Sequence, residues 1–521
     1  MNGPKVVTAE QAVALVASGA TVLVDGSGGG VNEPDLLLRA LERRFLKTGQ
    51  PRGLTLVHPA GIGDGRGGGM DRFAHEGMVR RVIGAHWAWS PRLQEMARQE
   101  LIEAYCLPQG VMSHLLRAIA AGGPGLVSHV GLGTFVDPRL DGGRLNRSAT
   151  EPLVELVELR GREWLLYHAL PIDVAVIRAS VADEQSNLVM DDEGLYAETL
   201  SAAQAVKNSG GVVLAQVKGI AERVDPRRVK VPGVLVDAVT VHPGQRLSMA
   251  TESDPTLTGR QPAAAGGFAP LELTVRKVIA RRAAQELRAG DIVNLGFGMP
   301  DGVAAVLAEE DAAGQVTLTL EQGHIGGVPA TGSDFGLARD QVAMVDAGYQ
   351  FDWYDGGGLD VAVLSFAEVD AAGDVNVSKF GGRTPGIGGF VNISQGARRV
   401  VFVGTFTAGK EQRLRLGQEL VVERDGAARK FVGAVEQVSF SAAHARRRGR
   451  PVTYVTERAV FELAGDGLVL TEIAPGVDLD RDVIGRMAFT PRISPELRAM
   501  DARLFGPAPM GLRLAPAGAI A

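Results

Sequence analysis

Apolar residues recur along the chain in two patterns, a helical stripe and a continuous run typical of a strand. In "TAEQAVALVASG", Thr8 and Gln11 form a capping box that predicts the start of an amphipathic helix, which Gly19 ends. The next residues, "ATVLVDGSGGG", predict a buried strand that runs into a glycine turn. The same order returns at residues 271–290, a second helical stripe followed by "DIVNLGFGMPDG". The sequence therefore uses helix, strand and glycine turn twice.

Two more pairs of segments are similar between the first and second parts of the chain. "IDVAVIRAS" from Ile172 resembles "LDVAVLSFA" from Leu359, and "AQAVKNSGGVVLAQV" resembles "ISQGARRVVFVGT". Three repeated blocks in one order favour two related halves. Between them, "TESDPTLTGRQPAAAGGFAP" is rich in Pro, Gly, Ala and Thr and has no periodicity, as is typical of a linker. We therefore predict a first half over residues 1–255, a linker over 256–270 and a second half over 271–521.

The predicted strands indicate the fold class. "GGVVLAQV" and "RRVVFVG" are continuous apolar runs, and they alternate with helical patterns such as "EPDLLLRALERRFL". Strands that are apolar on both faces are typical of a parallel sheet covered by helices. We predict an α/β protein in which each half is a mainly parallel sheet covered by helices.

Composition narrows the classes of partner and the compartment. The chain has 521 residues, a formal charge of −6 and 45% apolar residues, so it lacks the basic surface that nucleic-acid binding needs. A single cysteine, Cys106, cannot close an intrachain disulfide. No signal peptide or membrane-spanning run stands out. We expect a cytoplasmic protein that binds neither nucleic acid nor membrane.

Two common kinds of ligand site are poorly supported. "GDGRGG" from Gly63 fits a dinucleotide-binding glycine motif, but the next apolar stretch ends in His and Trp instead of the acidic residue that such a fold requires. The nine histidines are scattered and show no ligand spacing, so we expect no metal site.

The stretch "VTLTLEQGHIGG" is the most informative for function. It places Glu321 where a predicted strand ends, and the carboxyl ends of strands in an α/β sheet face the ligand crevice. Most glutamates at such a position are solvated or cap a helix. Here Gly323, Gly326 and Gly327 follow and leave room for a reactant. A carboxylate nucleophile also needs N–H donors for the oxyanion, and "GIGGF" at 386–390 and "NLGFG" at 294–298 could supply them.

The chain resembles the family I coenzyme A transferases in their fused single-chain form, with an α-like half and a β-like half. The acetate, propionate and short-chain acyl-CoA transferases are most similar, and the succinyl-CoA:3-oxoacid transferases are more distant. The resemblance covers nearly the whole chain and rests on ordered motifs: "LTLVHPAGIGDG", "AHEGMVRRVIGAHW", "LPQGVMSHLLRAIAAG", "HVGLGTFVDPR", "EQGHIGGVPATGSDFG", "FDWYDGGGLDVA", "NVSKFGGR", "GGFVNISQGARRVVFVGTFTAG" and "YVTERAVFEL".

The resemblance implies a ping-pong exchange between acyl-CoA and a short-chain carboxylate. Glu321 would attack the acyl-CoA thioester to form a mixed anhydride, and the released CoA thiolate would then give a glutamyl-CoA thioester. A second carboxylate would reverse these steps. Coenzyme A is thus a substrate and covalent intermediate, and the resemblance implies no permanently bound cofactor. It also implies a homo-oligomer, a dimer or a tetramer.

The resemblance also assigns the residues around Glu321. Gln109, Asn376 and Gly389 would contact the oxyanion or substrate, and the CoA-binding residues would be Gly388, Gly389, Gly296 and Gly298. His324 would narrow the acyl pocket, contact a substrate carboxylate or point away from the site.

Two alternatives remain open from the sequence. An acyl-CoA hydrolase on the same fold would admit water in place of the second acid, and a non-catalytic metabolite sensor would bind the ligand without reaction. The sequence does not select the acyl donor or acceptor, because one or two methylene groups change discrimination by only about 1–3 kcal/mol.

Overall fold

The chain forms two compact units in the computed structural model, which describes residues 5–263 and 270–516. Unit 1 contains Met1–Ala263, Leu320–Asp352 and Arg383–Asn392, and unit 2 contains Ala264–Thr319, Trp353–Gly382 and Ile393–Ala521. The predicted second half therefore gives two segments to unit 1, and these carry Glu321, Gly388 and Gly389. The units follow contacts in space, so they differ from the predicted halves 1–255 and 271–521, which follow the repeats in the sequence.

The predicted linker, 256–270, is also packed in part. Leu257 is fully buried in an apolar cluster with Leu195, Leu247 and Leu337. Residues 264–269 of the prediction lie outside the described residues. The composition of residues 256–263 indicated a loop, but composition alone did not reveal this one anchoring leucine.

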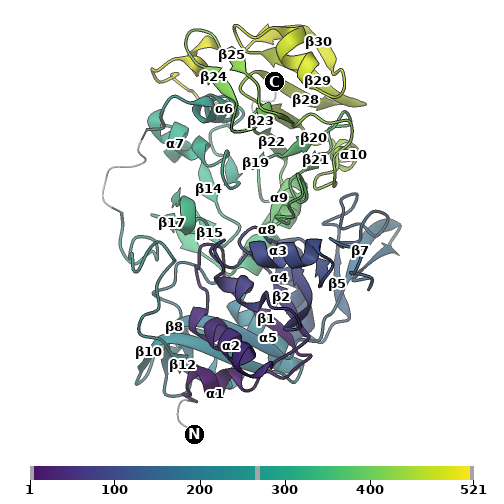
Figure 1. Ribbon diagram of the computed structural model, residues 1–521. Coiled ribbons are helices and arrows are strands. Elements are labelled where there is room, and N and C mark those ends of the chain that lie inside the picture. The colour runs from purple at the N-terminus through teal and green to yellow at the C-terminus, as the bar shows by residue number, and fades with distance from the viewer. Residues whose placement is uncertain (1–4, 264–269, 517–521) are drawn as a thin grey trace. The chain divides into compact units, whose positions relative to one another are not determined.

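Unit 1 is built on a largely parallel sheet (Figure 1). Its helices are α1 (Ala9–Val13), α2 (Asp35–Thr48), α3 (Pro91–Arg98), α4 (Gln109–Ala120) and α5 (Thr199–Asn208). Its main-sheet strands are β1 (Thr21–Val24), β2 (Leu54–His58), β3 (Val79–Gly84), β4 (Glu103–Tyr105), β8 (Val174–Asp183), β9 (Leu188–Val189), β10 (Val212–Ala221), β11 (Val229–Val231) and β12 (Ala238–Val241). Short strand pairs follow: β15 (His324–Ile325) with β18 (Ala343–Met344), and β16 (Val328–Pro329) with β17 (Ala338–Arg339).

The parallel strands of this sheet run in the order β4-β3-β2-β1-β8-β10-β12. All five residues of β2 are buried, as are nine of the ten residues of β8, so both faces of these strands are covered. Helix α5 packs on β8 and β10, and α4 packs on α5. The continuous apolar runs therefore predicted the parallel sheet correctly.

Local sequence signals set the ends of the first helices. The Thr8 side chain accepts from the N–H of Gln11, and the Gln11 side chain accepts from the N–H of Thr8, so the predicted capping box is confirmed. Gly49 ends α2 in the left-handed conformation, with φ of 70°, and donates its N–H to Phe45. The first helix ends at Val13, earlier than the predicted end at Gly19.

Unit 2 contains a second sheet with the same strand order at its centre. Its helices are α6 (Val275–Ala284), α7 (Gly302–Glu309) and α10 (Ala442–Arg447), while α8 (Ala347–Asp355) and α9 (Phe390–Gly396) have residues in both units. Its sheet strands are β13 (Ile292–Leu295), β14 (Thr317–Thr319), β19 (Val361–Ser365), β22 (Arg399–Val403), β27 (Val452–Val455), β28 (Ala459–Ala464), β29 (Gly467–Ile473) and β30 (Arg492–Ala499). Small pairs are β20 (Glu368–Val369) with β21 (Val375–Asn376), β23 (Thr407–Ala408) with β26 (Ala428–Arg429), and β24 (Arg413–Arg415) with β25 (Val421–Arg424).

The predicted duplication is visible in the topology. Parallel strands follow the order β2-β1-β8-β10-β12 in unit 1 and β14-β13-β19-β22-β27 in unit 2. The similar segments from Ile172 and Leu359 become β8 and β19, and the other similar pair becomes α5–β10 and α9–β22. Each pair of segments thus has the same place in its own sheet, which agrees with two related halves.

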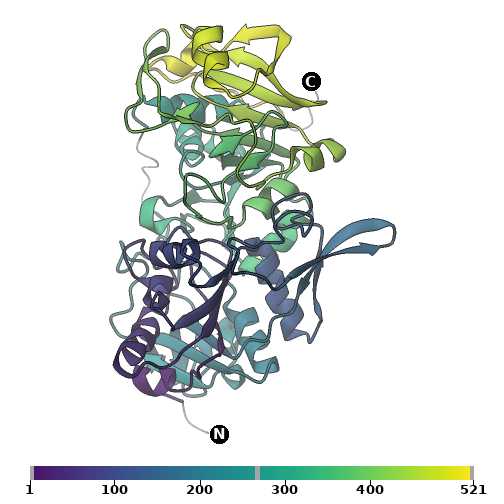
Figure 2. The same cartoon turned by 45° about the vertical axis from the view of Figure 1, so that its right-hand side comes forward.

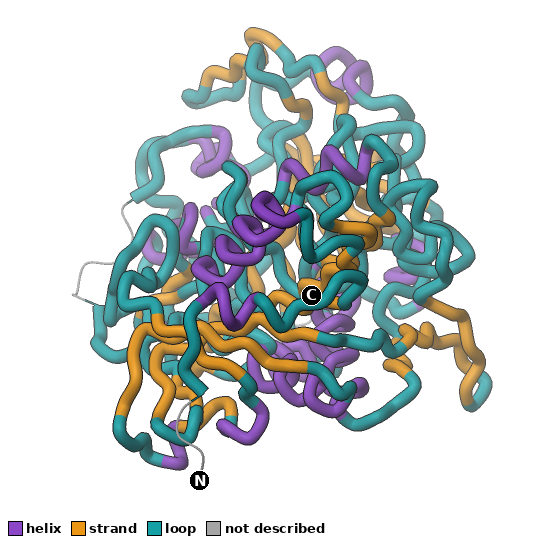
Figure 3. The backbone as a smooth tube through the Cα atoms, turned by 60° about the horizontal axis from the view of Figure 1, so that its bottom comes forward, coloured by secondary structure: helices purple, strands orange, loops and turns teal. Residues whose placement is uncertain are grey.

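A three-stranded antiparallel sheet extends from unit 1. It consists of β5 (Gly125–Ser128), β6 (Val154–Leu159) and β7 (Arg162–His168) in the order β5-β7-β6. The β6–β7 hairpin projects as an arm, drawn in blue in Figure 2. Much of the remaining chain is loop, drawn in teal in Figure 3. No helix among the described residues is both long and apolar enough to cross a bilayer.

Cys106 follows β4 and is fully buried. Its Sγ lies 3.2 Å from the carbonyl oxygen of Ala85, to which it donates. Burial raises the pKa of the thiol to about 12.

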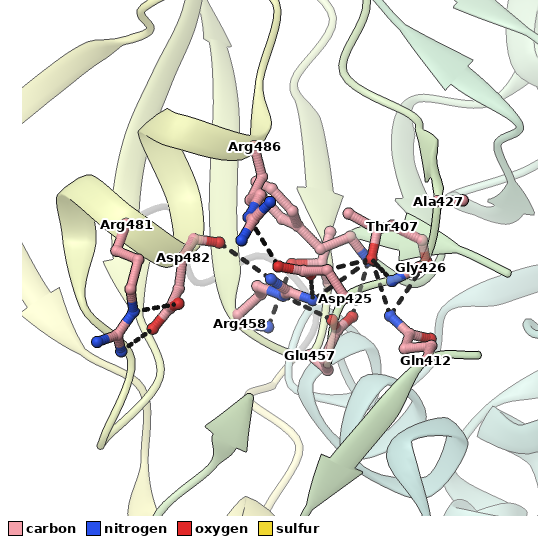
Figure 4. Close-up of polar contacts among 12 residues, drawn as sticks. Thr407, Gln412, Asp425, Gly426, Ala427, Glu457, Arg458, Arg481, Asp482 and Arg486 are labelled. Atoms are coloured by element: carbon pink, nitrogen blue, oxygen red, sulfur yellow. Dashed lines mark hydrogen bonds and ion pairs between the residues drawn. The ribbon is translucent and has the colours of Figure 1, made fainter. Parts of the chain in front are cut away.

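A buried ion-pair network connects three segments of unit 2 (Figure 4). The Arg458 guanidinium is fully buried and contacts Glu457 at 2.9 Å and Asp425 at 2.7 Å. Its Nη1 also donates to the carbonyl of Asp482 at 3.0 Å. Asp425 in turn pairs with Arg486 at 2.8 Å. One guanidinium therefore connects the residues after β25, the exit of β27 and the segment around residue 482.

We predict that Arg458→Met destabilises the protein by about 3–5 kcal/mol, because it leaves the buried Glu457 carboxylate without its cation. The measurement is chemical denaturation followed by circular dichroism. Arg481→Met is the matched control, since Arg481 pairs with Asp482 while its own side chain stays 68% exposed. That control should change the free energy of unfolding by no more than about 1 kcal/mol. Equal losses in both variants would contradict the role assigned to Arg458.

Candidate active site

Glu321 lies on a tight turn that begins where the predicted strand ends. The strand is β14, and the N–H of Gly323 donates to the carbonyl of Leu320 at 3.0 Å. The N–H of Leu320 donates to the carbonyl of His324 at 3.0 Å and closes the turn. Gly323 has φ of +112°, and a Cβ there would lie 1.9 Å from the carbonyl oxygen of Val345. The turn that presents Glu321 therefore requires glycine at position 323.

A second loop, residues 385–389, is bonded to the end of β3. The N–H groups of Ile387 and Gly388 both donate to the carbonyl of Ala85, at 2.7 and 2.8 Å. The N–H of Trp87 donates in the other direction, to the carbonyl of Pro385 at 2.7 Å. Gly388 has φ of +53°. These bonds fix the glycine loop against the exit of β3.

Gln109 meets Glu321 at this glycine loop. It opens α4, is only 3% exposed, and donates its N–H to the carbonyl of Gly388 at 2.9 Å. A Cβ built on Gly388 would lie 3.9 Å from Gln109 Oε1, 4.0 Å from Glu321 Oε1 and 3.7 Å from His86 Cδ2. Because glycine has no Cβ, an open point remains at Gly388, and the side chains of Gln109, Glu321 and His86 surround it.

The Glu321 carboxyl group is largely removed from water. Burial raises its pKa from 4.5 to about 7, against the opposing effect of hydrogen bonds from the N–H of Gly389 and the Gln322 side chain. The Gln322 Nε2 lies 3.3 Å from Glu321 Oε1. A carboxylate with this pKa is more basic than one in water, yet a large fraction is ionised at neutral pH. Both properties suit a nucleophile.

Two more carboxyl groups lie buried behind α4. Ser113 Oγ donates to Glu198 Oε1 at 2.5 Å, and Thr199 Oγ1 donates to Asp25 Oδ2 at 2.5 Å. Burial is the largest cause that raises the pKa of Asp25 to about 7 and that of Glu198 to about 8. The negative charges of Asp25 and Glu321 also raise the pKa of Glu198. Protonation of Glu198 at neutral pH therefore limits the negative charge that accumulates near Glu321.

His324 points into the interior of unit 1. It is fully buried, and its Nε2 lies 2.8 Å from the carbonyl oxygen of Gly194. Burial lowers its pKa to about 4, so the ring is neutral. Of the three orientations considered from the sequence, this contact favours the one that points away from substrate.

The remaining predicted residues, Gly296, Gly298 and Asn376, belong to unit 2. Gly296 and Gly298 follow β13, and Gly298 has φ of +90° with open space where a Cβ would be. Asn376 is fully buried in β21, and its Nδ2 donates to Glu368 at 2.7 Å and to the carbonyl of Lys379 at 2.5 Å. These bonds give Asn376 a local structural role, and its contact with substrate stays a prediction.

Of the predicted site residues, unit 1 therefore brings together Glu321, Gln109, Gly388 and Gly389, and their roles stay predictions. The sequence alone did not indicate His86, Glu198 or Asp25 as site residues. His86 follows a predicted strand, as Glu321 does, and this position could have indicated a site residue. Many other polar residues have the same position, so the pattern is not specific. In the described part of the chain, no three His, Cys, Asp or Glu side chains are placed to hold a metal ion.

Comparison with known proteins identifies the family. A family model described as coenzyme A transferase matches residues 6–242. The chain is 43% identical to the acetate CoA-transferase YdiF of Escherichia coli K12, over 98% of this chain and 96% of that protein. It is also 43% identical to the caffeate CoA-transferase of Acetobacterium woodii, over 96% of this chain and 97% of that protein.

A solved structure agrees over almost the whole chain. The structure of the acyl-CoA transferase YdiF from Escherichia coli O157:H7, described as a thioester complex with CoA, superimposes with a TM-score of 0.93. It is 42% identical in sequence, and the match covers 99% of this chain and 98% of that one. Because the similarity in sequence and in structure extends over nearly the full chain, the chain belongs to the coenzyme A transferase family.

Proposed function

We propose that this protein transfers CoA from a short-chain acyl-CoA to a free carboxylate, with Glu321 as the nucleophile. The observation that carries the proposal is the desolvated Glu321 carboxyl group, which accepts from the N–H of Gly389 and faces Gln109 across the open point at Gly388. Exchange of one carboxylate for another breaks one thioester and forms another, so the reaction needs no external energy source. The enzyme has only to lower the activation barrier. A covalent intermediate divides that barrier into smaller steps.

Each step follows from these positions. A Glu321 oxygen attacks the thioester carbonyl carbon, the C–S bond breaks, and CoA leaves as a thiolate with an acyl-glutamyl anhydride on the enzyme. The thiolate sulfur then attacks the Glu321 carbonyl carbon, and the anhydride C–O bond breaks to release the first carboxylate. The incoming carboxylate reverses both steps. Charge on the carbonyl oxygens is stabilised by N–H donors, for which we propose Gly389 and the Gln109 amide.

The rest of the proposed site extends to CoA. We propose that Gly388 and Gly389 contact the thioester region, that Gly296 and Gly298 approach the CoA chain, and that Asn376 contacts the substrate carboxylate. Open space at Gly298 supports its part of this assignment. Contacts to the remote part of CoA would provide binding energy that offsets the strain of the enzyme thioester. Coenzyme A is a substrate here, and the proposal includes no resident cofactor.

The acyl group is proposed to be short. An acetate CoA-transferase is 43% identical over nearly the full chain and supports this class. A caffeate CoA-transferase is equally identical in sequence, and caffeate is a much larger acid than acetate. The size of the acyl group therefore has to be measured directly. We further propose a homo-oligomer, a dimer or tetramer, located in the cytoplasm; the single buried cysteine is compatible with a reducing compartment.

The nucleophile can be tested by trapping. Wild-type protein mixed with acetyl-CoA alone should gain the mass of CoA, less water, and digestion should place the adduct on the peptide with Glu321. Glu321→Gln should show neither the adduct nor transfer, because the amide has no nucleophilic oxygen of comparable basicity. Glu198→Gln is a matched control that changes a buried carboxyl group of similar pKa, and it should still form the adduct. Transfer by Glu321→Gln would disprove the proposed role.

The reaction should depend on pH through Glu321 itself. The ionised carboxylate is the attacking form, so the rate of adduct formation at low acyl-CoA concentration should rise as pH increases and level off above about 7. Below that pH we expect a change of about tenfold per unit. Rapid-quench mass spectrometry of the enzyme–CoA adduct would follow this step.

The pKa values of the other titratable groups near Glu321 show which of them could also affect the pH dependence of adduct formation. His58 and His86 have pKa values lowered to about 4, so they stay neutral through the transition. Glu198 has a pKa raised to about 8, and Glu198→Gln removes its titration. The variant should keep an inflection near neutral pH. A flat profile in wild-type protein would contradict ionisation of Glu321 as its source.

Substrate class can be tested with a panel of donors and acceptors. With acetate as acceptor, we expect propionyl- and butyryl-CoA to react at higher kcat/KM than caffeoyl-CoA, and we expect acetyl-CoA to react readily with propionate. CoA release without any acceptor acid should be slow, because the site has to exclude water to preserve the anhydride. A preference for caffeoyl-CoA would overturn the short-chain assignment, and rapid release without acceptor would indicate a hydrolase.

A further inference from the structure

His86 lies at the same sheet edge as Gln109. Strand β3 ends at Gly84, and β3 runs parallel to β4, after which Gln109 opens α4. Carboxyl ends of neighbouring parallel strands share one edge, where ligands bind in α/β folds. The His86 side chain is only partly buried, unlike that of His58 at the end of β2, which is 1% exposed. The His86 side chain thus keeps some exposed surface, although most of it is buried.

The backbone fixes His86 against the glycine loop. His86 forms an antiparallel bridge with Gly386, and the residues before and after it, Ala85 and Trp87, make the three backbone bonds described above to residues 385–388. Gly61 makes room on the other side, since a Cβ there would lie 2.5 Å from His86 Nδ1. The imidazole is therefore held between two glycine segments.

This packing determines which edge of the ring meets the reaction. Nδ1 lies next to Gly61, whereas Cδ2, the ring atom bonded to Nε2, lies next to Gly388. Cδ2 would be 3.7 Å from a Cβ on Gly388, and Glu321 Oε1 would be 4.0 Å from the same point. An acyl group attached to Glu321 has to occupy space beside this point. The imidazole of His86 and the carboxyl group of Glu321 thus border the same open point at Gly388.

The ring is also in the form suited to donate a hydrogen bond without giving up its proton. Burial, with a smaller effect of His58, lowers the pKa of His86 to about 4. A neutral imidazole has one N–H donor. Unlike an imidazolium, it would not attract the Glu321 carboxylate into an ion pair that reduces its nucleophilicity.

We infer that His86 is a further catalytic residue, whose Nε2–H donates to the carbonyl oxygen of the acyl group during attack by Glu321. The inference rests on the proposed function. As the Glu321 oxygen bonds to the thioester carbon, the carbonyl electron pair moves to oxygen, and His86 joins Gly389 and Gln109 as a donor. The electron pair then returns, the C–S bond breaks and the thiolate leaves. His86 keeps its proton throughout, so the step balances without an external acid.

The test compares His86→Phe, which keeps an aromatic ring of similar size without a donor, with His86→Gln, which keeps an N–H donor. The rate of adduct formation on Glu321 from acetyl-CoA should fall by about one hundredfold to one thousandfold in His86→Phe. His86→Gln should recover at least about tenfold of that loss. The fall should lie mainly in kcat, because the donor acts in the transition state.

Controls separate this inference from folding and from the proposed function. His168→Phe changes a partly exposed histidine of β7, which pairs with Glu155 at 3.0 Å, and should react at the wild-type rate. Thermal unfolding and CoA binding of each His86 variant, measured by calorimetry, should match wild type. Wild-type protein without an adduct would disprove the proposed function itself. A wild-type adduct together with an unchanged rate in His86→Phe, or a greater loss in His86→Gln than in His86→Phe, would overturn the role of His86 alone.

Discussion

The site depends on keeping one carboxyl group out of water while leaving it open to a bulky thioester. Desolvation alone would protonate Glu321 and make it inert at neutral pH. The N–H of Gly389 and the Gln322 side chain oppose that effect, so the pKa is held near 7. The position of Gly389 depends on backbone hydrogen bonds between the glycine loop and Ala85 and Trp87. The reactivity of the Glu321 side chain therefore depends on backbone N–H and C=O groups.

The two halves share a strand order but serve the site differently. Parallel strands of the first half position Gln109 and His86 at one sheet edge. The second half contributes two short segments, one with Glu321 and one with Gly388 and Gly389, and these belong to unit 1 instead of unit 2. In this duplicated fold the first half thus provides the sheet of the site, and two loop segments of the second half provide Glu321 and the glycine loop.

Features set by local sequence were predictable, and features set by distant pairing were not. The capping box at Thr8, the strand before Glu321 and the repeated strand segments follow from residue pattern, so the sequence predicted them correctly. The grouping of Gln109 with Gly388 was expected only through family resemblance. The approach of His86 to Gly388 joins residues that are 302 positions apart in the chain, and the approach of Asp25 to Glu198 joins residues that are 173 positions apart. Neither has a local signature.

Turnover releases a free CoA thiolate inside the protein, and this thiolate could exchange with any disulfide or react with oxidised protein sulfur. The chain has one cysteine, Cys106, and its thiol is bonded to the same Ala85 carbonyl that holds the glycine loop. With a pKa of about 12 it remains a buried, protonated thiol at cellular pH. The enzyme thus handles a reactive sulfur nucleophile while offering no reactive sulfur of its own, which protects it from mixed disulfides with its own substrate.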